Sequence, residues 1–152
     1  MDDQAITKRI NEFSEFFNMK DTIHQRMNEF SKGMKQKVVI ASAMIHNPQV
    51  IFMDEPLNGL DANTALLLKK LLKNLANEGK TIFYCSHILD VVENLCDRVV
   101  IIDKGKIVAD GSVEKLKEMT KRSSLEGVFS QLTNTEDLGE LAKAFSRSIT
   151  GV

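Results

Sequence analysis

The N-terminal third of the chain shows hydrophobic residues at helical spacing. Apolar side chains recur every three or four positions over residues 3–17, with acids and bases between them, which predicts an amphipathic helix. A second apolar stripe predicts a helix over residues 32–46, with Ser31 as its N-cap. Asn47-Pro48 ends that helix, because a residue before proline avoids the α region.

The middle of the chain alternates short apolar runs with longer helical patterns. The run at 49–53 is almost wholly apolar, which predicts a strand that is buried on both faces, as in a parallel sheet with helices above and below. A second buried strand is expected at 81–85 and a third strand at 99–102. Leucine-rich helices are expected over 62–76 and 89–95, between these strands. The alternation predicts an α/β layered fold with right-handed crossovers.

The C-terminal part begins with a turn at Lys104-Gly105, which predicts a hairpin from the third strand into residues 107–109. Two short helices are expected after it, the first ending at Met119 and the second capped by Ser124. The tail from Thr133 is polar and only weakly helical in pattern.

Length and charge narrow the class of protein. The 152 residues suffice for one domain or one large piece of a domain, and 43% hydrophobic with 27% charged residues is ordinary globular usage. Twenty basic against 21 acidic residues give a net charge of -1, so we expect no nucleic-acid partner. No apolar run is long enough to span a bilayer.

Chemically active side chains follow two neighbouring strands. Asp54-Glu55 follows the first strand and Ser86-His87 the second, and ligands of such folds gather at this edge of the sheet. Asp54 is suited to orient water on Mg²⁺, and Glu55 to polarise an attacking water as a general base. His87 is placed to contact a phosphate oxygen or that water. The alternative is two solvated acids that end a strand and a loop histidine without a role.

Ser31-Lys32-Gly33 begins the second helix with a hydroxyl, a small residue and free backbone N–H groups, which admit an anion. An ordinary N-cap is the alternative. A phosphate-binding P-loop requires the pattern G-x-x-x-x-G-K-[ST]. Gly79-Lys80-Thr81 supplies its end, but Asn74 replaces the first glycine and the segment runs from helix to strand. We find no P-loop in these residues.

Four motifs in a fixed order resemble the C-terminal two-thirds of an ABC transporter nucleotide-binding domain, over residues of about 10–132. They are the signature motif at Phe30 to Lys37 (FSKGMKQK), the Walker B strand at Val50 to Pro56, the D-loop at Asn58-Gly59-Leu60-Asp61, and the switch histidine at Ser86-His87. Residues 124–129 resemble the short C-terminal helix of bacterial ABC-2-type exporters. The chain departs from the commonest signature at Lys32, usually glycine, and at Met34, usually glutamine.

The resemblance implies a P-loop NTPase-like (RecA-like) layered α/β fold with a mainly parallel sheet, truncated at its N-terminus. Residues 1–48 would form part of the helical subdomain with the signature, 49–120 the catalytic core, and 121–152 a C-terminal helix and tail. The adenine-stacking loop, Walker A and the Q-loop would precede residue 1.

The resemblance also implies the activity, an ATP-binding and ATP-hydrolysing subunit that couples hydrolysis to transport, with export as the direction. Two domains would pair head to tail, and a transmembrane permease subunit would dock near residues 5–30. The protein would be cytoplasmic and peripheral at the inner face of the membrane. The 152-residue chain alone is not expected to hydrolyse ATP. ATP would be contacted in trans by Ser31, Lys32, Gly33 and Met34, while in cis Asp54 would bind Mg²⁺ through water and Glu55 and His87 would be catalytic.

Two other functions stay open at this point. One is a catalytically silent truncated fragment. The other is an ABC ATPase of DNA repair or chromosome maintenance, which shares these motifs. The near-neutral charge and the lack of coiled-coil heptads disfavour that second alternative.

Overall fold

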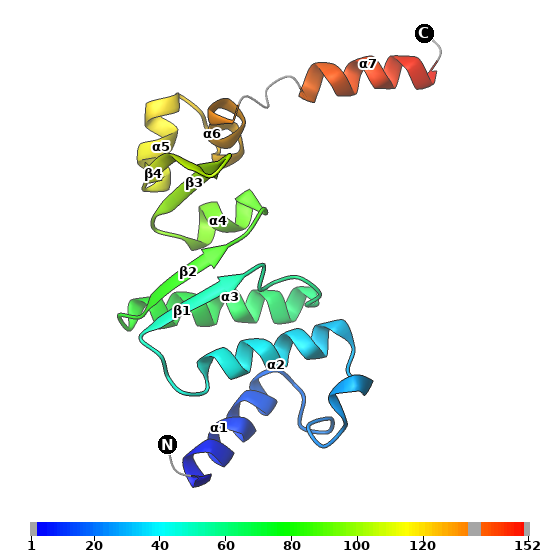
Figure 1. Ribbon diagram of the computed structural model, residues 1–152, viewed down its shortest axis with the longest axis vertical. Helices are drawn as coiled ribbons and strands as arrows, with labels where there is room; N and C mark the ends of the chain where they lie inside the picture. Colours follow the sequence, from blue (N-terminus) through cyan, green and yellow to red (C-terminus); the bar gives the residue numbers. More distant parts are fainter. Residues whose placement is uncertain (1–2, 134–137, 151–152) are drawn as a thin grey trace. The chain divides into compact units, whose positions relative to one another are not determined.

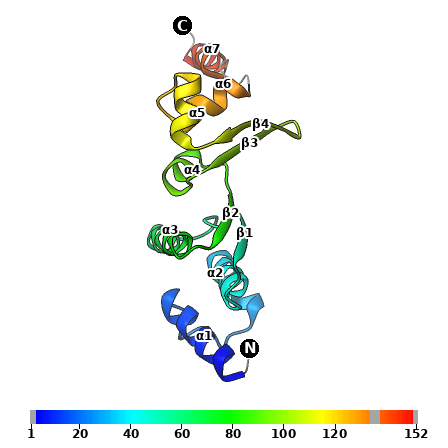
Figure 2. The same cartoon turned by 90° about the vertical axis from the view of Figure 1, so that its left-hand side faces the viewer.

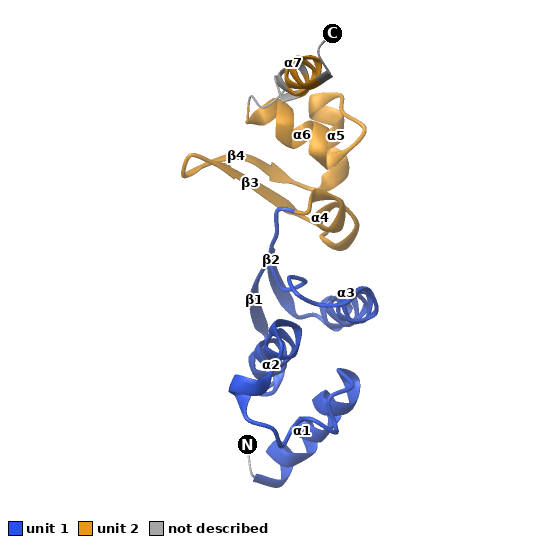
Figure 3. Cartoon of the chain, turned by 90° about the vertical axis from the view of Figure 1, so that its right-hand side faces the viewer, with its two compact units in different colours: residues 1–87 blue, residues 88–152 orange. Residues whose placement is uncertain are grey.

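A computed structural model describes residues 3–133 and 138–150. The chain divides into two compact units, residues 1–87 and 88–152 (Figure 3). Each unit has its own two-stranded sheet.

The first unit consists of helices that flank one parallel strand pair (Figure 1). Ser31 is the N-cap of its second helix, as predicted, and its Oγ accepts the N–H of Met34 at 3.2 Å. The predicted helices and the first two predicted strands are confirmed within two residues at each end. The elements are α1 (Asp3–Phe16), the 3-10 helix η1 (Met27–Glu29), α2 (Lys32–Met44), β1 (Val50–Asp54), α3 (Ala62–Asn77) and β2 (Thr81–Cys85).

Strands β1 and β2 are parallel, with Phe52 opposite Phe83 in the register. Helix α3 lies on one side of this pair (Figure 2), and Ile51 and Met53 are buried. Phe52, which alternates with them, is 73% exposed. The prediction of burial on both faces is therefore wrong for the described part of the chain, because α3 covers one face and leaves the other accessible.

The second unit contains the predicted hairpin and a group of short helices. Strands β3 and β4 are antiparallel, with an irregularity between Ile101 and Ile102. Leu125 and Val128 are fully buried here. The elements are α4 (Leu89–Leu95), β3 (Val99–Asp103), β4 (Lys106–Gly111), α5 (Val113–Thr120), α6 (Leu125–Leu132) and α7 (Leu138–Thr150).

One carboxylate joins three helices of the second unit. Glu93 on α4 accepts a hydrogen bond from the Lys117 ammonium on α5 and the Leu125 N–H at the start of α6, at 2.7 Å. The Lys117 hydrogen bond, more than the others, holds the pKa of Glu93 below its usual value. Glu93 therefore fixes how α4, α5 and α6 pack on one another.

The polar tail includes a full helix, α7, whose Phe145 and Ile149 are exposed. Residues 134–137, the stretch of the predicted tail directly after Thr133, lie outside the described residues. Among the helices of the described ranges, none combines the length and the apolar character that crossing a bilayer requires.

Candidate functional site

The residue directly after β1 has an unusual backbone. Glu55 has φ 44°, in the left-handed region that non-glycine residues rarely adopt. Its N–H donates to the carbonyl of Cys85 at 3.0 Å, at the end of β2. The ends of the two parallel strands therefore meet at Glu55, as the sequence predicted for this edge of the sheet.

The Glu55 carboxylate is held by the two residues that follow β2. Its Oε1 lies 2.6 Å from Nδ1 of His87 and accepts the His87 backbone N–H at 2.8 Å. Its Oε2 accepts the Ser86 hydroxyl at 3.2 Å. The His87 ring hydrogen bond is the largest of the causes that lower the pKa of Glu55. The carboxylate is thus ionised at neutral pH and fixed in orientation, and Nε2 of His87 is directed away from it.

Asp54 is exposed at the last position of β1, opposite Cys85 in the register. Mg²⁺ prefers oxygen ligands, keeps several waters, and is commonly bound by one or two carboxylates together with phosphates. A single exposed carboxylate at this edge fits such a site. The described residues contain no group of three or more His, Cys, Asp or Glu side chains that would enclose a metal ion.

The start of α2 is in close contact with the loop after β1. A Cβ on Gly33 would lie 2.5 Å from the carbonyl oxygen of Gly59, so only glycine fits without movement. Gly59 has φ 80°, and the aliphatic stem of Lys32 packs against it. The structure therefore brings two of the predicted motifs together, the signature and the D-loop.

Two residues one turn later strengthen this contact. The Gln36 amide donates to the Pro56 carbonyl at 3.2 Å, and the Lys37 ammonium lies 3.9 Å from Oδ2 of Asp61. Gln36 and Lys37 lie within the predicted signature motif, but the sequence assigned neither of them a role of its own. Their spacing of three and four residues from Gly33 was the available signal, because it places them on the same helix face.

The remaining D-loop residues form the turn that leads into α3. The Asn58 N–H donates to the Glu55 carbonyl at 3.1 Å, and the Leu60 N–H donates to that of Leu57 at 3.2 Å. Asp61 is the N-cap of α3 and accepts the N–H of Thr64 at 2.9 Å and its hydroxyl at 2.6 Å. The Thr64 hydroxyl is the main cause of the lowered pKa of Asp61. Residues 55–61 thus connect the Glu55–His87 pair to the start of α2.

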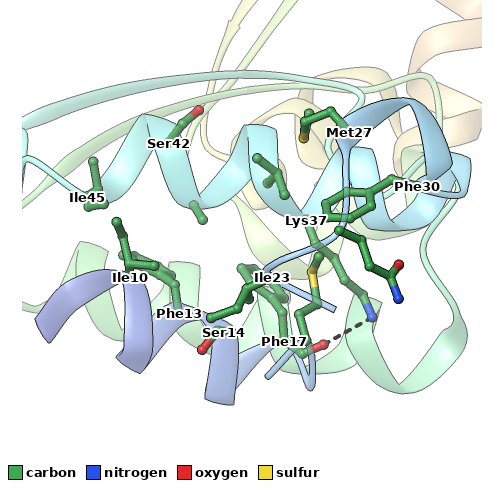
Figure 4. A pocket seen from close by; sticks show the side chains of 14 residues that line it. Ile10, Phe13, Ser14, Phe17, Ile23, Met27, Phe30, Lys37, Ser42 and Ile45 are labelled. Carbon is green, nitrogen blue, oxygen red and sulfur yellow. Dashed lines mark hydrogen bonds between the residues drawn. The ribbon is translucent and has the colours of Figure 1, made fainter. Parts of the chain in front are cut away.

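A cavity of about 310 Å³ lies between α1, the segment after it and α2 (Figure 4). Its walls are mainly apolar and include Phe13, Phe17 and Phe30. Lys37 lies at its edge, where the ammonium donates to the Phe17 carbonyl at 3.2 Å (Figure 4). The first unit therefore offers an apolar hollow on its helical part.

Several known proteins have sequences similar to that of this chain. The family model for ABC transporters matches residues 1–58. The ABC transporter ATP-binding protein NatA of Bacillus subtilis is 40% identical over 124 residues, 82% of this chain and 50% of NatA. The Nod factor export ATP-binding protein I of Rhizobium etli is 37% identical over 64% of this chain and 31% of its own length. The methionine import ATP-binding protein MetN 1 of Staphylococcus aureus is 32% identical over 96% of this chain and 43% of its own length.

A solved structure agrees with the sequence relatives. The ATP-binding subunit of an ABC transporter superposes with a TM-score of 0.82 at 29% identity, covering 88% of this chain and 56% of that chain. The chain spans half of the length of NatA and less of the other two relatives. The layered α/β architecture is thus that of the P-loop NTPase fold. On these matches and this geometry, the chain belongs to the ABC transporter ATP-binding protein family.

Proposed function

We propose that this chain is the signature-to-switch part of a subunit that hydrolyses ATP and couples hydrolysis to transport. The observation that carries the proposal is the Glu55 carboxylate, held by Ser86 and His87 directly after Asp54. An oriented carboxylate at the carboxyl end of parallel strands is suited to activate a water for attack on phosphate.

Each residue of this edge has a distinct role in the proposal. Glu55 orients the attacking water and accepts its proton. Its lowered pKa keeps the carboxylate charged at neutral pH, so orientation contributes more than basicity. His87 holds Glu55 through Nδ1 and presents Nε2 to a phosphate oxygen. Asp54 would hold Mg²⁺ through water, and the metal would neutralise phosphate charge.

The start of α2 serves a second nucleotide in the proposal. Ser31, Lys32, Gly33 and Met34 lie at a helix N-terminus, where backbone N–H groups and the helix dipole favour an anion. They would contact the γ-phosphate held by a second nucleotide-binding domain, paired head to tail. The Walker A element that holds each nucleotide in cis would come from outside these 152 residues, and without it the chain would be catalytically silent.

A transmembrane subunit is the further partner that we propose. The apolar cavity of the first unit, lined by residues from 10 to 45, supports docking of an apolar segment on the helical part. The proposed division then assigns docking and the signature to residues 1–48, catalysis to 49–120 and the C-terminal helices to 121–152. The protein would sit peripherally on the cytoplasmic face of the membrane.

Export is the direction that we propose. Residues 124–129 form the start of α6, capped by Ser124, and they carry the exporter-like sequence pattern. One relative is named as an export protein and another as an import protein, so the C-terminal helix is what favours export.

A chimera tests the proposed function. This chain would replace the matching region of NatA, and Glu55→Gln would be compared with Glu78→Gln, an exposed glutamate at the end of α3. We expect Glu55→Gln to reduce ATP turnover by about 10²–10⁴-fold with ATP binding retained, and the control to be unchanged. Near-normal turnover of Glu55→Gln would contradict the assignment.

A further inference from the structure

The helix α7 (Leu138–Thr150) exposes an apolar stripe. Phe145 is 66% and Ile149 70% exposed, and their spacing of four residues puts them on one face of the helix. In the sequence, Leu138 and Leu141 recur with the same periodicity, seven and four residues before Phe145. Every side chain from Ala142 to Ile149 is exposed. Over these residues the described chain therefore leaves the apolar face of α7 accessible to water.

A helix of this kind is not stable by itself. α7 has 13 residues, and isolated helices shorter than about 12–15 residues are marginal in water. Gly139, Ser146 and Ser148 are weak helix formers. Lys143 and Arg147 carry like charges four residues apart, which disfavours the helix further. Most helical stability in proteins comes from packing of an apolar face, so α7 requires a partner on that face.

The distribution of charge on α7 indicates which partner this is. Helical spacing puts Lys143 and Arg147 on the face opposite Phe145 and Ile149. The positions that flank the apolar stripe hold small, uncharged residues, Ala142, Ala144, Ser146 and Ser148. An anionic membrane surface attracts helices that are rich in Lys and Arg, whereas α7 carries two basic residues and one acidic residue. An identical helix suits these flanks better, because small side chains let two helices approach closely and set no like charges against each other.

We infer that α7 packs against α7 of a second copy of this chain, through the stripe that contains Phe145 and Ile149. The contact is isologous, so that the same residues of both copies meet. The inference rests on the proposed function, because the head-to-tail pairing of two nucleotide-binding domains brings two copies of α7 into one assembly.

The length of α7 limits how strong this contact is. A helix of 13 residues is about 20 Å long, and two such helices bury less surface than the roughly 1,200 Å² at which stable interfaces begin. Two copies of α7 should therefore sustain a weak, reversible dimer. The same contact adds to the affinity when the nucleotide sites also pair, because the second contact is then intramolecular.

The test uses the NatA chimera, which retains α7, in a dilution series without nucleotide. Pairing then depends on neither ATP binding nor turnover, and sedimentation velocity measures the dissociation constant of the dimer. Phe145→Glu and Ile149→Glu should each raise this constant at least tenfold, because a carboxylate would be buried in an apolar contact. Arg147→Glu is the matched control. It adds the same side chain on the opposite face of α7 and should leave the constant unchanged.

Amide hydrogen exchange separates pairing from loss of folding. In the unsubstituted chimera, residues 142–149 should exchange at least tenfold more slowly at the concentrated end of the series than at the dilute end, because single α7 helices open readily. Residues 125–132 in α6, where Leu125 and Val128 are fully buried, should exchange at the same rate throughout. This measurement needs no substitution, so it decides the matter if a variant is unstable.

Three outcomes would overturn the inference. They are the absence of a dimer, a dimer that Phe145→Glu and Ile149→Glu form equally well, and exchange of residues 142–149 that does not depend on concentration. Binding of the chimera to phosphatidylglycerol vesicles that Phe145→Glu abolishes, without any dimer, would assign the stripe to a membrane surface instead.

The same chimera keeps the two proposals apart. A dimer that depends on Phe145 and Ile149, in a chimera without ATP turnover, supports the inference and counts against the proposed function. ATP turnover that requires Glu55, in a chimera without an α7-dependent dimer, counts against the inference alone.

Discussion

Replacing Gly33 by alanine tests the contact between the signature and the D-loop. In a helix, glycine to alanine normally stabilises by about 0.5–1 kcal/mol, because alanine loses less backbone entropy on folding. At Gly33 the new Cβ would lie 2.5 Å from the Gly59 carbonyl oxygen. The structure therefore predicts that the sign of the effect reverses.

The magnitude follows from what has to move. The separation must widen from 2.5 Å to at least 3.4 Å, the start of ordinary van der Waals contact. The obstructing atom is backbone, in a turn that is tied to α2 by the Gln36–Pro56 hydrogen bond. Overpacking of this kind costs about 1–3 kcal/mol, so after the gain in helix propensity we expect a net loss of about 1–2 kcal/mol.

Urea unfolding followed by Tyr84 fluorescence measures this loss, because the chain has one tyrosine and no tryptophan, and Tyr84 lies in the first unit. With a slope of about 1 kcal/mol per M, the midpoint should fall by roughly 1–2 M. Gly139→Ala is the control, since a Cβ on this helical glycine meets nothing within 4 Å. The helicity of the Gly139→Ala variant, measured by circular dichroism, should not be lower than that of the unsubstituted chain. An unchanged or higher midpoint for Gly33→Ala would refute the close contact.

Other substitutions test the rest of the structure. Glu93→Gln should lower the stability of the second unit by about 2 kcal/mol in thermal melts, because a charged hydrogen bond is lost, while the exposed Glu114→Gln should not. The pKa of Glu93 is lowered on folding. The ionised carboxylate therefore stabilises the folded state above about pH 4.5, and this stabilisation is lost as the pH falls through the lower pKa that Glu93 has in the folded protein. Glu93→Gln should therefore flatten the acid side of the stability curve, and an unchanged curve would contradict this. In the NatA chimera, Ser31→Arg should block turnover but not ATP binding by the same chain, and loss of that binding would contradict the role in trans. The isolated chain should self-associate and should not bind Mg-ATP with useful affinity. Light scattering measures the first property and titration calorimetry the second. A monomer that binds Mg-ATP with micromolar affinity would disprove this prediction.

Much of the secondary structure could be predicted from the sequence because its signals are local. Ser31, Asp61 and Ser124 each begin a helix as N-cap, and their side chains act within three residues of themselves. Apolar periodicity then gives the helix interiors.

The burial of β1 and β2 could not be predicted in this way. Phe52 and Phe83 are exposed in the structure, and a run of apolar residues predicts a buried strand without showing which element, if any in the described ranges, covers each of its faces. The Glu55–His87 pair was placed at the correct edge by topology. The hydrogen bond between Glu55 and His87, and the contacts of Gln36 and Lys37 with residues 56–61, depend on tertiary geometry. The spacing of residues along the sequence does not determine that geometry.

The left-handed backbone of Glu55 sets stability against activity at this position. With φ 44°, a side chain with a Cβ costs about 1–2 kcal/mol there, whereas glycine costs almost nothing and asparagine less than glutamate. This backbone strain is opposed by the hydrogen bonds that the carboxylate makes with Ser86 and His87, and a glycine at this position would relieve the strain but lose those bonds. Any stabilised version of this domain should hold residue 55 fixed, since the strained backbone belongs to the residue to which we assign the chemistry.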